Sequence, residues 1–204
     1  MRTLLLASHN PGKARELAAL LAGLPLRVCS LADYPAVSLP PETGAAYGEN
    51  AALKARAAAQ AGVCWALGDD SGLEVPALGG APGLRSSRVA PSDPERIAWL
   101  LERMRDLPED RRPARFVCAL ALADEGGELL GAWEGTAEGL VLPEPRGSGG
   151  FGYDPVFLYP PAGLTFAEMT AEQKAAVSHR GAALRAFRSA LPDLLCVRGG
   201  REES

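Results

Sequence analysis

A short continuous apolar run at residues 64–67 (Cys-Trp-Ala-Leu) constrains the fold of this chain most strongly. The run does not alternate apolar and polar residues, so it predicts a β-strand that is covered on both faces. Such strands belong to sheets with helices packed on both sides. The run leads directly into Gly68-Asp-Asp-Ser-Gly72, which puts two carboxylates at the carboxyl end of the strand. The sequence therefore predicts an α/β protein with an acidic pair beside its sheet.

Helical and strand patterns alternate along the rest of the chain, which supports the α/β class. Further strands are expected at residues 3–7, 26–28, 116–123, 128–133, 140–142 and 156–159. Helices are expected at residues 14–21, 48–61, 94–105 and 172–191, and a long irregular loop at 75–89. The strands at 116–123 and 128–133 flank Asp124-Glu-Gly-Gly and form a predicted hairpin, so the sheet is expected to be mixed.

Length and composition are typical of a globular protein. The 204 residues are 47% hydrophobic and 23% charged, a size at which neither disulfides nor a structural metal is needed. The four cysteines are widely spaced and, with two histidines, show no zinc-binding pattern. We expect one domain over residues 1–198 and a short polar tail at 199–204. The first apolar run is too short for a signal segment or a membrane span, so a cytoplasmic protein without membrane partners is expected.

The charge balance argues against a nucleic acid as partner. The formal net charge is −4, whereas proteins that bind nucleic acids generally carry a basic face. Lysine, asparagine and histidine are scarce, with only three, two and two copies, and all of them fall in three segments. Residues 1–21 carry three basic and one acidic side chain, and residues 146–188 carry five and three, so both stretches are locally positive.

The first segment, Ser8-His-Asn-Pro-Gly-Lys13, lies between a predicted strand and a predicted helix. Unpaired backbone N–H groups and the positive end of the helix dipole favour a phosphate at such a turn. Gly12 allows close approach of the backbone, and Lys13 adds a positive charge. The G-x-x-x-x-G-K-[ST] pattern of a P-loop is absent, and ordinary turn chemistry is the alternative interpretation.

The second segment joins Glu49-Asn-Ala-Ala-Leu-Lys54 on a predicted helix to the acidic pair that follows the buried strand. Open α/β sheets bind ligands at the carboxyl ends of their strands. Successive side chains of an extended segment point in opposite directions, so Asp69 and Asp70 are expected to differ in role. One would bind a metal or a water and the other would anchor the loop. Carboxylates without His or Cys nearby favour Mg²⁺, while an Asp-Ser-Gly turn bonded to local backbone is the alternative.

The third segment is the glycine-rich loop Gly147-Ser-Gly-Gly-Phe-Gly-Tyr-Asp154, followed by Lys174 and Ser178-His-Arg180. Phe151 offers a flat face to a nucleobase, and such stacking contributes roughly 1–3 kcal/mol per base in single-stranded nucleic acids. Lys174 and Ser178 are one helical turn apart and are expected to share a helix face. Side chains that could meet base edges or phosphates are Asp154, Lys174, His179 and Arg180. The alternatives are Phe151 in the core, and Lys174 and His179 on a helix surface.

In this order, these residues resemble the family of inosine/xanthosine triphosphate pyrophosphatases, also called Ham1-like proteins or noncanonical purine NTP pyrophosphatases. The resemblance covers nearly the whole chain. The matching segments begin at Leu6, Glu49, Asp69, Leu78, Gly149, Phe166 and Ser178, and read LASHNPGKAREL, ENAALKAR, DDSGLEV, LGGAPG, GGFGYDPVF, FAEM and SHRG.

The resemblance implies an elongated mixed β-sheet with flanking helices, two lobes around a central cleft, a homodimer, and Mg²⁺-dependent hydrolysis of ITP, dITP and XTP to monophosphate and pyrophosphate. Asp70 would be the general base that activates water, and would share Mg²⁺ with Glu42. The triphosphate would bind Ser8, His9, Asn10, Pro11, Gly12, Lys13 and Lys54. Ser71 would touch the substrate, and the base would be surrounded by Phe151, Gly152, Tyr153, Asp154, Lys174, His179 and Arg180, the last two at its 6-oxo group.

Two positions depart from the family pattern. Gly68 stands where relatives commonly have Ala, and Pro40-Pro41 stiffens the loop that must bring Glu42 to Asp70. Two other functions stay open: a Maf-like pyrophosphatase for modified or pyrimidine nucleotides, and a nucleotide-binding sensor without turnover. A sensor would be expected to lose Asp70, Lys13 or the metal carboxylate, and the chain retains all three.

Overall fold

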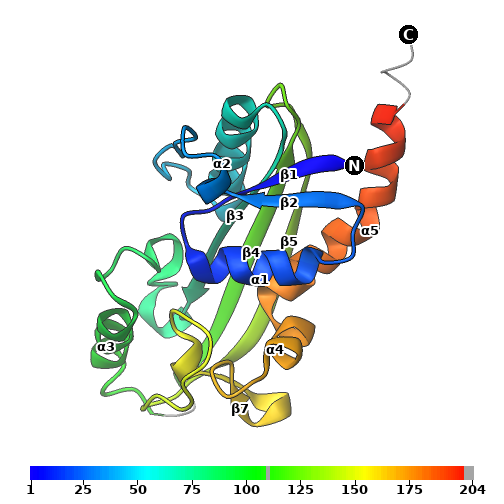
Figure 1. Ribbon diagram of the computed structural model, residues 1–204. Coiled ribbons are helices and arrows are strands. Elements are labelled where there is room, and N and C mark those ends of the chain that lie inside the picture. The colour runs from blue at the N-terminus through cyan, green and yellow to red at the C-terminus, as the bar shows by residue number, and fades with distance from the viewer. Residues whose placement is uncertain (109–110, 200–204) are drawn as a thin grey trace. The chain divides into compact units, whose positions relative to one another are not determined.

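The computed structural model describes residues 1–108 and 111–199. In these residues seven strands form one mixed sheet in the order β2-β1-β3-β4-β5-β6-β7, which confirms the α/β prediction (Figure 1). The strands are β1 (Arg2–Ala7), β2 (Leu26–Ser30), β3 (Trp65–Glu74), β4 (Pro113–Ala123), β5 (Leu129–Val141), β6 (Phe157–Tyr159) and β7 (Leu164–Thr165). The helices are α1 (Pro11–Leu21), α2 (Tyr47–Gly62), α3 (Asp93–Arg103), α4 (Ala171–Val177) and α5 (His179–Gly199).

The chain forms two compact units. Unit 1 consists of Met1–Asp70, Ala119–Gly135 and Arg180–Ser204, and unit 2 of Ser71–Cys118 and Thr136–His179. The single domain expected over residues 1–198 stays a prediction. Of the tail expected at 199–204, residues 200–204 lie outside the described part of the chain. In residues 1–108 and 111–199, no helix has the length and apolar character that crossing a membrane requires.

In unit 1, β1 pairs in parallel with both β2 and β3. Helix α1 connects β1 to β2, and α2 lies between β2 and β3 in the chain (Figure 1). Since such crossovers are right-handed as a rule, the two helices are expected on opposite faces of these strands. The direction of strand addition reverses between β1 and β3, and open α/β sheets bind ligands at the carboxyl ends of strands where this happens. Ala7 at the end of β1 pairs with Gly68, so Asp69 and Asp70 extend just past the end of β1.

The packing of α2 against β3 explains why residue 68 is a glycine. A Cβ at this position would lie 2.0 Å from the Ala51 carbonyl oxygen and 2.9 Å from the Ala55 nitrogen. Ala51 and Ala55 are fully buried. Only glycine permits this close approach of the helix, which carries two polar residues of the candidate site, Asn50 and Lys54.

Unit 2 has its own apolar core, in which residues of α3, β3, β4 and β5 meet the segment 153–166. Its centre is a cluster of three aromatic rings. Phe116 lies 4.6 Å from Phe157 and 5.9 Å from Phe166, measured between ring centroids, and Phe157 lies 4.8 Å from Phe166. Tyr153 of the glycine-rich loop 147–154 belongs to the same core.

Two strand predictions are corrected by the structure. The strand predicted to end at residue 67 runs on to Glu74, so the acidic pair lies inside β3 rather than after it. Ion pairs, described below, allow these polar residues to be buried in a strand. The two short strands predicted at 128–133 and 140–142 are one strand, β5. In its middle, exposed Glu134, Thr136 and Glu138 alternate with buried small residues. Because these buried residues are glycine and alanine, the sequence shows no clear apolar alternation there.

Two helix predictions are also corrected. The helix predicted at 172–191 breaks at Ser178, which is extended with φ −77° and ψ 158°. Serine side chains compete with the backbone bonds of a helix, and the break removes the predicted helix face shared by Lys174 and Ser178. The helix predicted at 14–21 begins earlier, at Pro11, because Asn10 caps it.

Candidate active site

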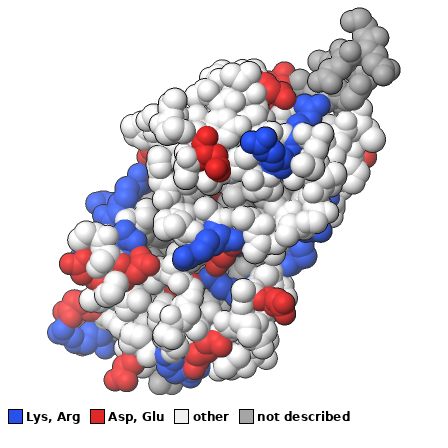
Figure 2. Space-filling model, in the orientation of Figure 1, with Lys and Arg blue, Asp and Glu red and all other residues white. Residues whose placement is uncertain are grey.

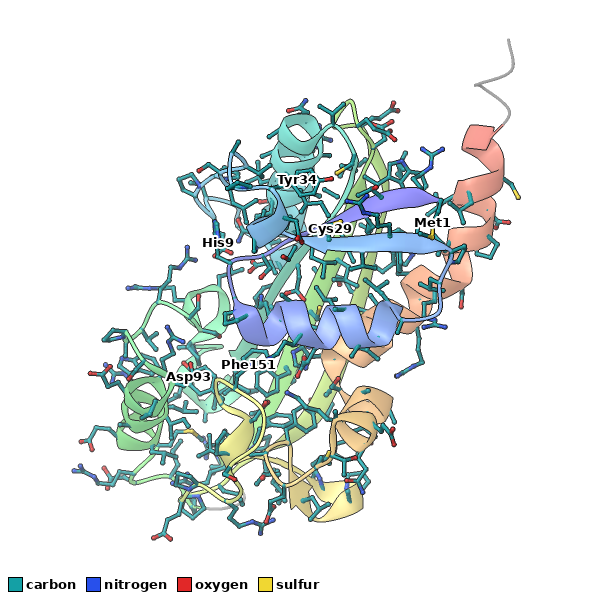
Figure 3. The ribbon with its side chains drawn as sticks, viewed as in Figure 1. Met1, His9, Cys29, Tyr34, Asp93 and Phe151 are labelled. Carbon is teal, nitrogen blue, oxygen red and sulfur yellow. The ribbon has the colours of Figure 1, made fainter. Side chains whose placement is uncertain are left out.

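The loop between β1 and α1 is organised by the side chain of Asn10. Its Oδ1 accepts hydrogen bonds from the backbone nitrogens of Gly12 at 2.9 Å and Lys13 at 3.1 Å. Ser8 Oγ accepts one from the Asn10 nitrogen at 3.2 Å. Pro11 opens the helix, and the exposed His9 projects from the loop (Figure 3). Two of the N–H groups at the helix start, those of Gly12 and Lys13, which the sequence left for a phosphate, therefore already donate to Asn10.

Asp69 is fully buried at the centre of an ion network. Its Oδ1 lies 2.7 Å from Lys13 Nζ, and its Oδ2 accepts a hydrogen bond from Arg180 Nε at 2.7 Å. Arg180 Nη1 also donates to Glu16 Oε2 on α1 at 2.5 Å. Burial opposes ionisation of Asp69, but the Arg180 and Lys13 charges outweigh it and hold the pKa well below its usual range. Asp69 thus anchors the start of α1 and the start of α5.

Asp70 has different neighbours, as the alternation of side chains in a strand predicted. Its Oδ2 accepts a hydrogen bond from Asn50 Nδ2 at 3.0 Å, and its Oδ1 lies 3.4 Å from Lys54 Nζ. Lys54 Nζ also lies 2.6 Å from Glu42 Oε1, so one ammonium joins two carboxylates. Burial raises the pKa of Asp70, while the attraction of Lys54 and Lys13 opposes that rise and Glu42 adds to it.

The carboxylates of Glu42 and Asp70 fit a divalent cation that takes its remaining coordination positions from water and a bound substrate. Glu42 and Asp70 already converge on one cationic group, Lys54 Nζ, despite the two prolines before Glu42. In the part of the chain that the structure describes, no three His, Cys, Asp or Glu side chains gather in a closed metal site. Mg²⁺ commonly binds through one or two carboxylates together with water and substrate phosphates, so two carboxylates suffice.

The loop that carries Phe151 lies in unit 2 and is fixed by hydrogen bonds. Gly150 and Gly152, on either side of Phe151, have φ values of +71° and +62°. Asp154 Oδ2 accepts hydrogen bonds from the Phe151 nitrogen at 2.8 Å and from Lys174 Nζ at 2.5 Å. Lys174 Nζ lies 4.9 Å from the centroid of the Phe151 ring, a cation–π distance. Three predicted site residues therefore meet in unit 2.

His179 and Lys174 do not lie on a helix surface, so that alternative is wrong. Lys174 is 6% exposed and His179 4% exposed. The imidazole stacks on Phe116, with centroids 4.6 Å apart and planes 11° apart. Tyr153 is buried too, and its hydroxyl donates to the Ser86 carbonyl oxygen at 2.9 Å. Ser71 follows Asp70 in β3 and is partly buried.

Some contacts were not foreseen from the sequence. Asn50 was noted only as one of two asparagines, yet it bonds to Asp70 and accepts a hydrogen bond from the Gly44 nitrogen at 2.8 Å. Its scarcity was the signal, but no role followed from it. Glu16 gave no signal, because nothing in the sequence pairs it with Arg180. Arg180 was predicted at the base, and the structure brings it together with Asp69 and Glu16 in unit 1.

Comparison with known proteins finds close relatives along nearly the whole chain. A model of the Ham1 family matches residues 4–190. A Thermus thermophilus protein named dITP/XTP pyrophosphatase is 54% identical over 190 residues, which cover 92% of this chain and 91% of the relative. A HAM1 protein from Coxiella burnetii has a TM-score of 0.83 and 39% identity over 95% of this chain and 100% of its own. A nucleoside-triphosphatase, or dITP/XTP pyrophosphatase, from Mycobacterium abscessus has a TM-score of 0.71 and 41% identity over 91% and 98%.

Proposed function

The chain belongs to the Ham1 family, and on that premise we propose that it hydrolyses noncanonical purine nucleoside triphosphates such as ITP, dITP and XTP. The products are the nucleoside monophosphate and pyrophosphate, so the enzyme removes these nucleotides from the pool. The observation that carries the proposal is the buried Asp70 carboxylate, held by Asn50 beside Lys54 and Glu42, in a chain whose relatives bear the name dITP/XTP pyrophosphatase.

In this proposal, unit 1 binds the triphosphate. Lys13 and Lys54 are its positive charges, and the capped start of α1 directs the helix dipole toward an anion. Both lysines are paired with carboxylates in the free protein, Lys13 with Asp69 and Lys54 with Glu42. These pairs hold the ammonium groups in place before a phosphate arrives, which limits the ordering cost of binding.

Asp70 acts as the general base. A carboxylate whose pKa is raised by burial is a better proton acceptor than an exposed aspartate, and Asn50 fixes its orientation. The water that loses its proton to Asp70 attacks the α-phosphorus, and pyrophosphate leaves. Glu42 and Asp70 would hold Mg²⁺, which when bound stabilises the negative charge that develops on the phosphoryl oxygens.

Unit 2 binds the base in this proposal. Phe151 stacks on the purine, Lys174 lies over the Phe151 ring and donates to Asp154, and His179 stacks on Phe116. Donor groups there favour a 6-oxo group and oppose the 6-amino group of adenine. Buried polar groups left without partners can make such discrimination large. Arg180 at the 6-oxo group stays a prediction, as do the substrate contacts of Ser8, His9 and Ser71.

We also propose that the chain acts in the cytoplasm, as a homodimer and as one domain over residues 1–198. The alignments with the relatives extend over more than nine-tenths of the chain, which supports a single functional domain. Light scattering coupled to size-exclusion chromatography measures the mass in solution, and a value near 21.3 kDa, that of one chain, would reject the dimer.

The decisive test is pyrophosphate release from a panel of ITP, XTP, dITP, GTP, ATP, UTP and TTP, with Mg²⁺ and with EDTA. We expect release from the first three, little from ATP, and loss of activity in EDTA. Binding without release from any nucleotide would support the sensor instead. A preference for UTP or TTP would support the Maf-like alternative. Full activity in EDTA would show that the reaction does not need a metal ion.

A further inference from the structure

Asp93, in the first turn of α3, bonds to the loop that carries Phe151. Its Oδ2 accepts a hydrogen bond from the backbone nitrogen of Gly152 at 2.7 Å, across 59 residues of sequence. Figure 3 labels Asp93 and Phe151 close together, and both residues belong to unit 2. No sequence motif of the predicted site includes Asp93.

With the bond from Gly152, the backbone on both sides of Phe151 is held by hydrogen bonds. The peptide N–H before the Phe151 Cα donates to Asp154 at 2.8 Å, and the peptide N–H after it donates to Asp93. These two bonds fix both peptide planes that flank the residue, and with them the direction of the Cα–Cβ bond that carries the ring. The flanking glycines, at positive φ, have many other conformations available, so such bonds are needed to select one.

Asp93 is itself held in place. Its Oδ1 accepts a hydrogen bond from Arg96 Nη1 at 2.6 Å. The other nitrogens of Arg96 donate to backbone carbonyl oxygens, Nε to Ala90 at 2.9 Å and Nη2 to Pro91 at 3.2 Å. The two oxygens of one carboxylate therefore connect a braced arginine to the loop, and the loop bond is charge-assisted.

We infer that Asp93 is a positioning residue for base recognition, which sets the direction in which the Phe151 side chain leaves the backbone, through the Gly152 amide. The inference rests on the proposed function, since it concerns the base that the loop stacks on. Asp93 touches neither the substrate nor the reacting atoms; it acts through the loop. The expected result of its loss is weaker and less selective binding of the base, with the phosphate chemistry of unit 1 left intact.

Asp93→Asn separates the two contacts of the carboxylate. An amide has one acceptor oxygen and no charge. If its oxygen accepts from Gly152, the bond is no longer charge-assisted and the NH₂ faces the Arg96 guanidinium; if its oxygen accepts from Arg96, the bond from Gly152 is lost, so in both cases Gly152 is held less firmly. Because hydrogen bonds to charged groups are among the stronger ones, we expect KM for ITP to rise about tenfold with kcat nearly unchanged. The preference for ITP over ATP is expected to fall. In Asp93→Asn with Arg96→Gln, the Gln oxygen accepts from the Asn NH₂, and KM is expected to return most of the way.

Glu95→Gln is the matched control. Glu95 lies in the same helical turn and loses the same charge, but its carboxylate accepts from the Ser92 nitrogen and hydroxyl and caps the helix. We expect this variant to lower stability without changing KM or the preference for ITP. Equal KM values for Asp93→Asn and the wild type would overturn the inference, as would an equal KM rise in Glu95→Gln.

Amide hydrogen exchange tests the same contact without turnover. In the metal-free and nucleotide-free protein, the Gly152 amide is expected to exchange about tenfold faster in Asp93→Asn than in the wild type or Glu95→Gln, since about 1.4 kcal/mol of protection is a factor of ten. Unchanged exchange at Gly152 would overturn the inference. If the wild-type protein released no pyrophosphate from any nucleotide, the proposed function would fail while this measurement still decided the role of Asp93.

Discussion

Two adjacent aspartates at the centre of the site have opposite electrostatic surroundings. Asp69 sits between Lys13 and Arg180, and its pKa is lowered despite complete burial. Asp70 accepts a hydrogen bond from an amide and lies beside Lys54 and a second carboxylate, and burial raises its pKa against the attraction of Lys54 and Lys13. The difference follows from strand geometry, because neighbouring side chains of β3 point to opposite faces. One carboxylate can therefore support the site while the other accepts a proton.

Asp70→Asn is expected to reduce ITP turnover by about 10²- to 10⁴-fold, since general bases contribute on that order. The amide cannot accept the proton of the attacking water, while its shape preserves the packing around Asn50. Nucleotide affinity, measured by calorimetry with a slowly hydrolysed ITP analogue, is expected to change little. Asp193→Asn, at an exposed position of α5, serves as the control. Turnover within a few-fold of wild type would take the role of base away from Asp70.

Asp69→Asn is expected to destabilise the protein by about 3–5 kcal/mol at pH 7, because it leaves the buried Arg180 charge without its carboxylate. The lowered pKa of Asp69 gives a stability contribution that is present above the unfolded-state pKa. That contribution is lost as the pH falls below about 4. Urea unfolding in EDTA at pH 7 and at pH 3 measures both effects, and the gap between variant and wild type should narrow at the lower pH. A larger difference in unfolding free energy at pH 3 than at pH 7 would contradict the lowered pKa of Asp69.

At the level of elements, the approach of α2 to β3 sets the distance between Asp70 and its helix partners. Gly68 lies on β3 directly against the α2 backbone at Ala51, and Asn50 and Lys54 project from that helix to Asp70. At the distance between the strand and the helix in this chain, a Cβ on residue 68 would collide with the α2 backbone, so the two elements fix the site through a contact that depends on Gly68. A change of residue there alters both packing and chemistry.

Gly68→Ala is expected to push α2 away from β3 and to cost about 1–3 kcal/mol of stability, the usual range for overpacking a core. The bonds from Asn50 and Lys54 to Asp70 should lengthen, and kcat for ITP should fall. Gly48→Ala, on α2 itself, is the matched control, since its Cβ would meet only Glu134 Oε1 at 3.8 Å and alanine favours a helix. Thermal unfolding and ITP turnover of both variants decide the matter. Wild-type behaviour of Gly68→Ala would mean that α2 does not set the site.

At the scale of the whole molecule, the net charge of −4 hides local differences. Basic and acidic side chains are interspersed on the face shown in Figure 2, and they form no continuous basic surface there. The lysines of the candidate site are paired with carboxylates. These features favour a single small nucleotide over a long polyanion, which needs many phosphate contacts at once.

A fluorescein-labelled 30-nucleotide DNA, single-stranded or duplex, is therefore expected not to bind at about 50 mM salt, where electrostatic binding is strong. Fluorescence anisotropy with up to about 10 µM protein measures this, near the tight end of nonspecific affinities. Competition of ITP against a fluorescent nucleotide in the same buffer shows that the protein is functional. Saturable DNA binding in that range would contradict the charge argument.

The sequence by itself determined the α/β class, the strand at residues 64–67 that is buried on both faces, and the segments that carry the candidate chemistry. It did so because periodicity and the scarcity of Lys, Asn and His are local signals. Tertiary structure alone decided that Asp69 pairs with Arg180 across 111 residues, that Ser178 breaks a helix, and that Asp93 bonds to Gly152. Those choices depend on which distant groups lie together in the fold, where a buried carboxylate or amide must find a partner, and no local pattern records them.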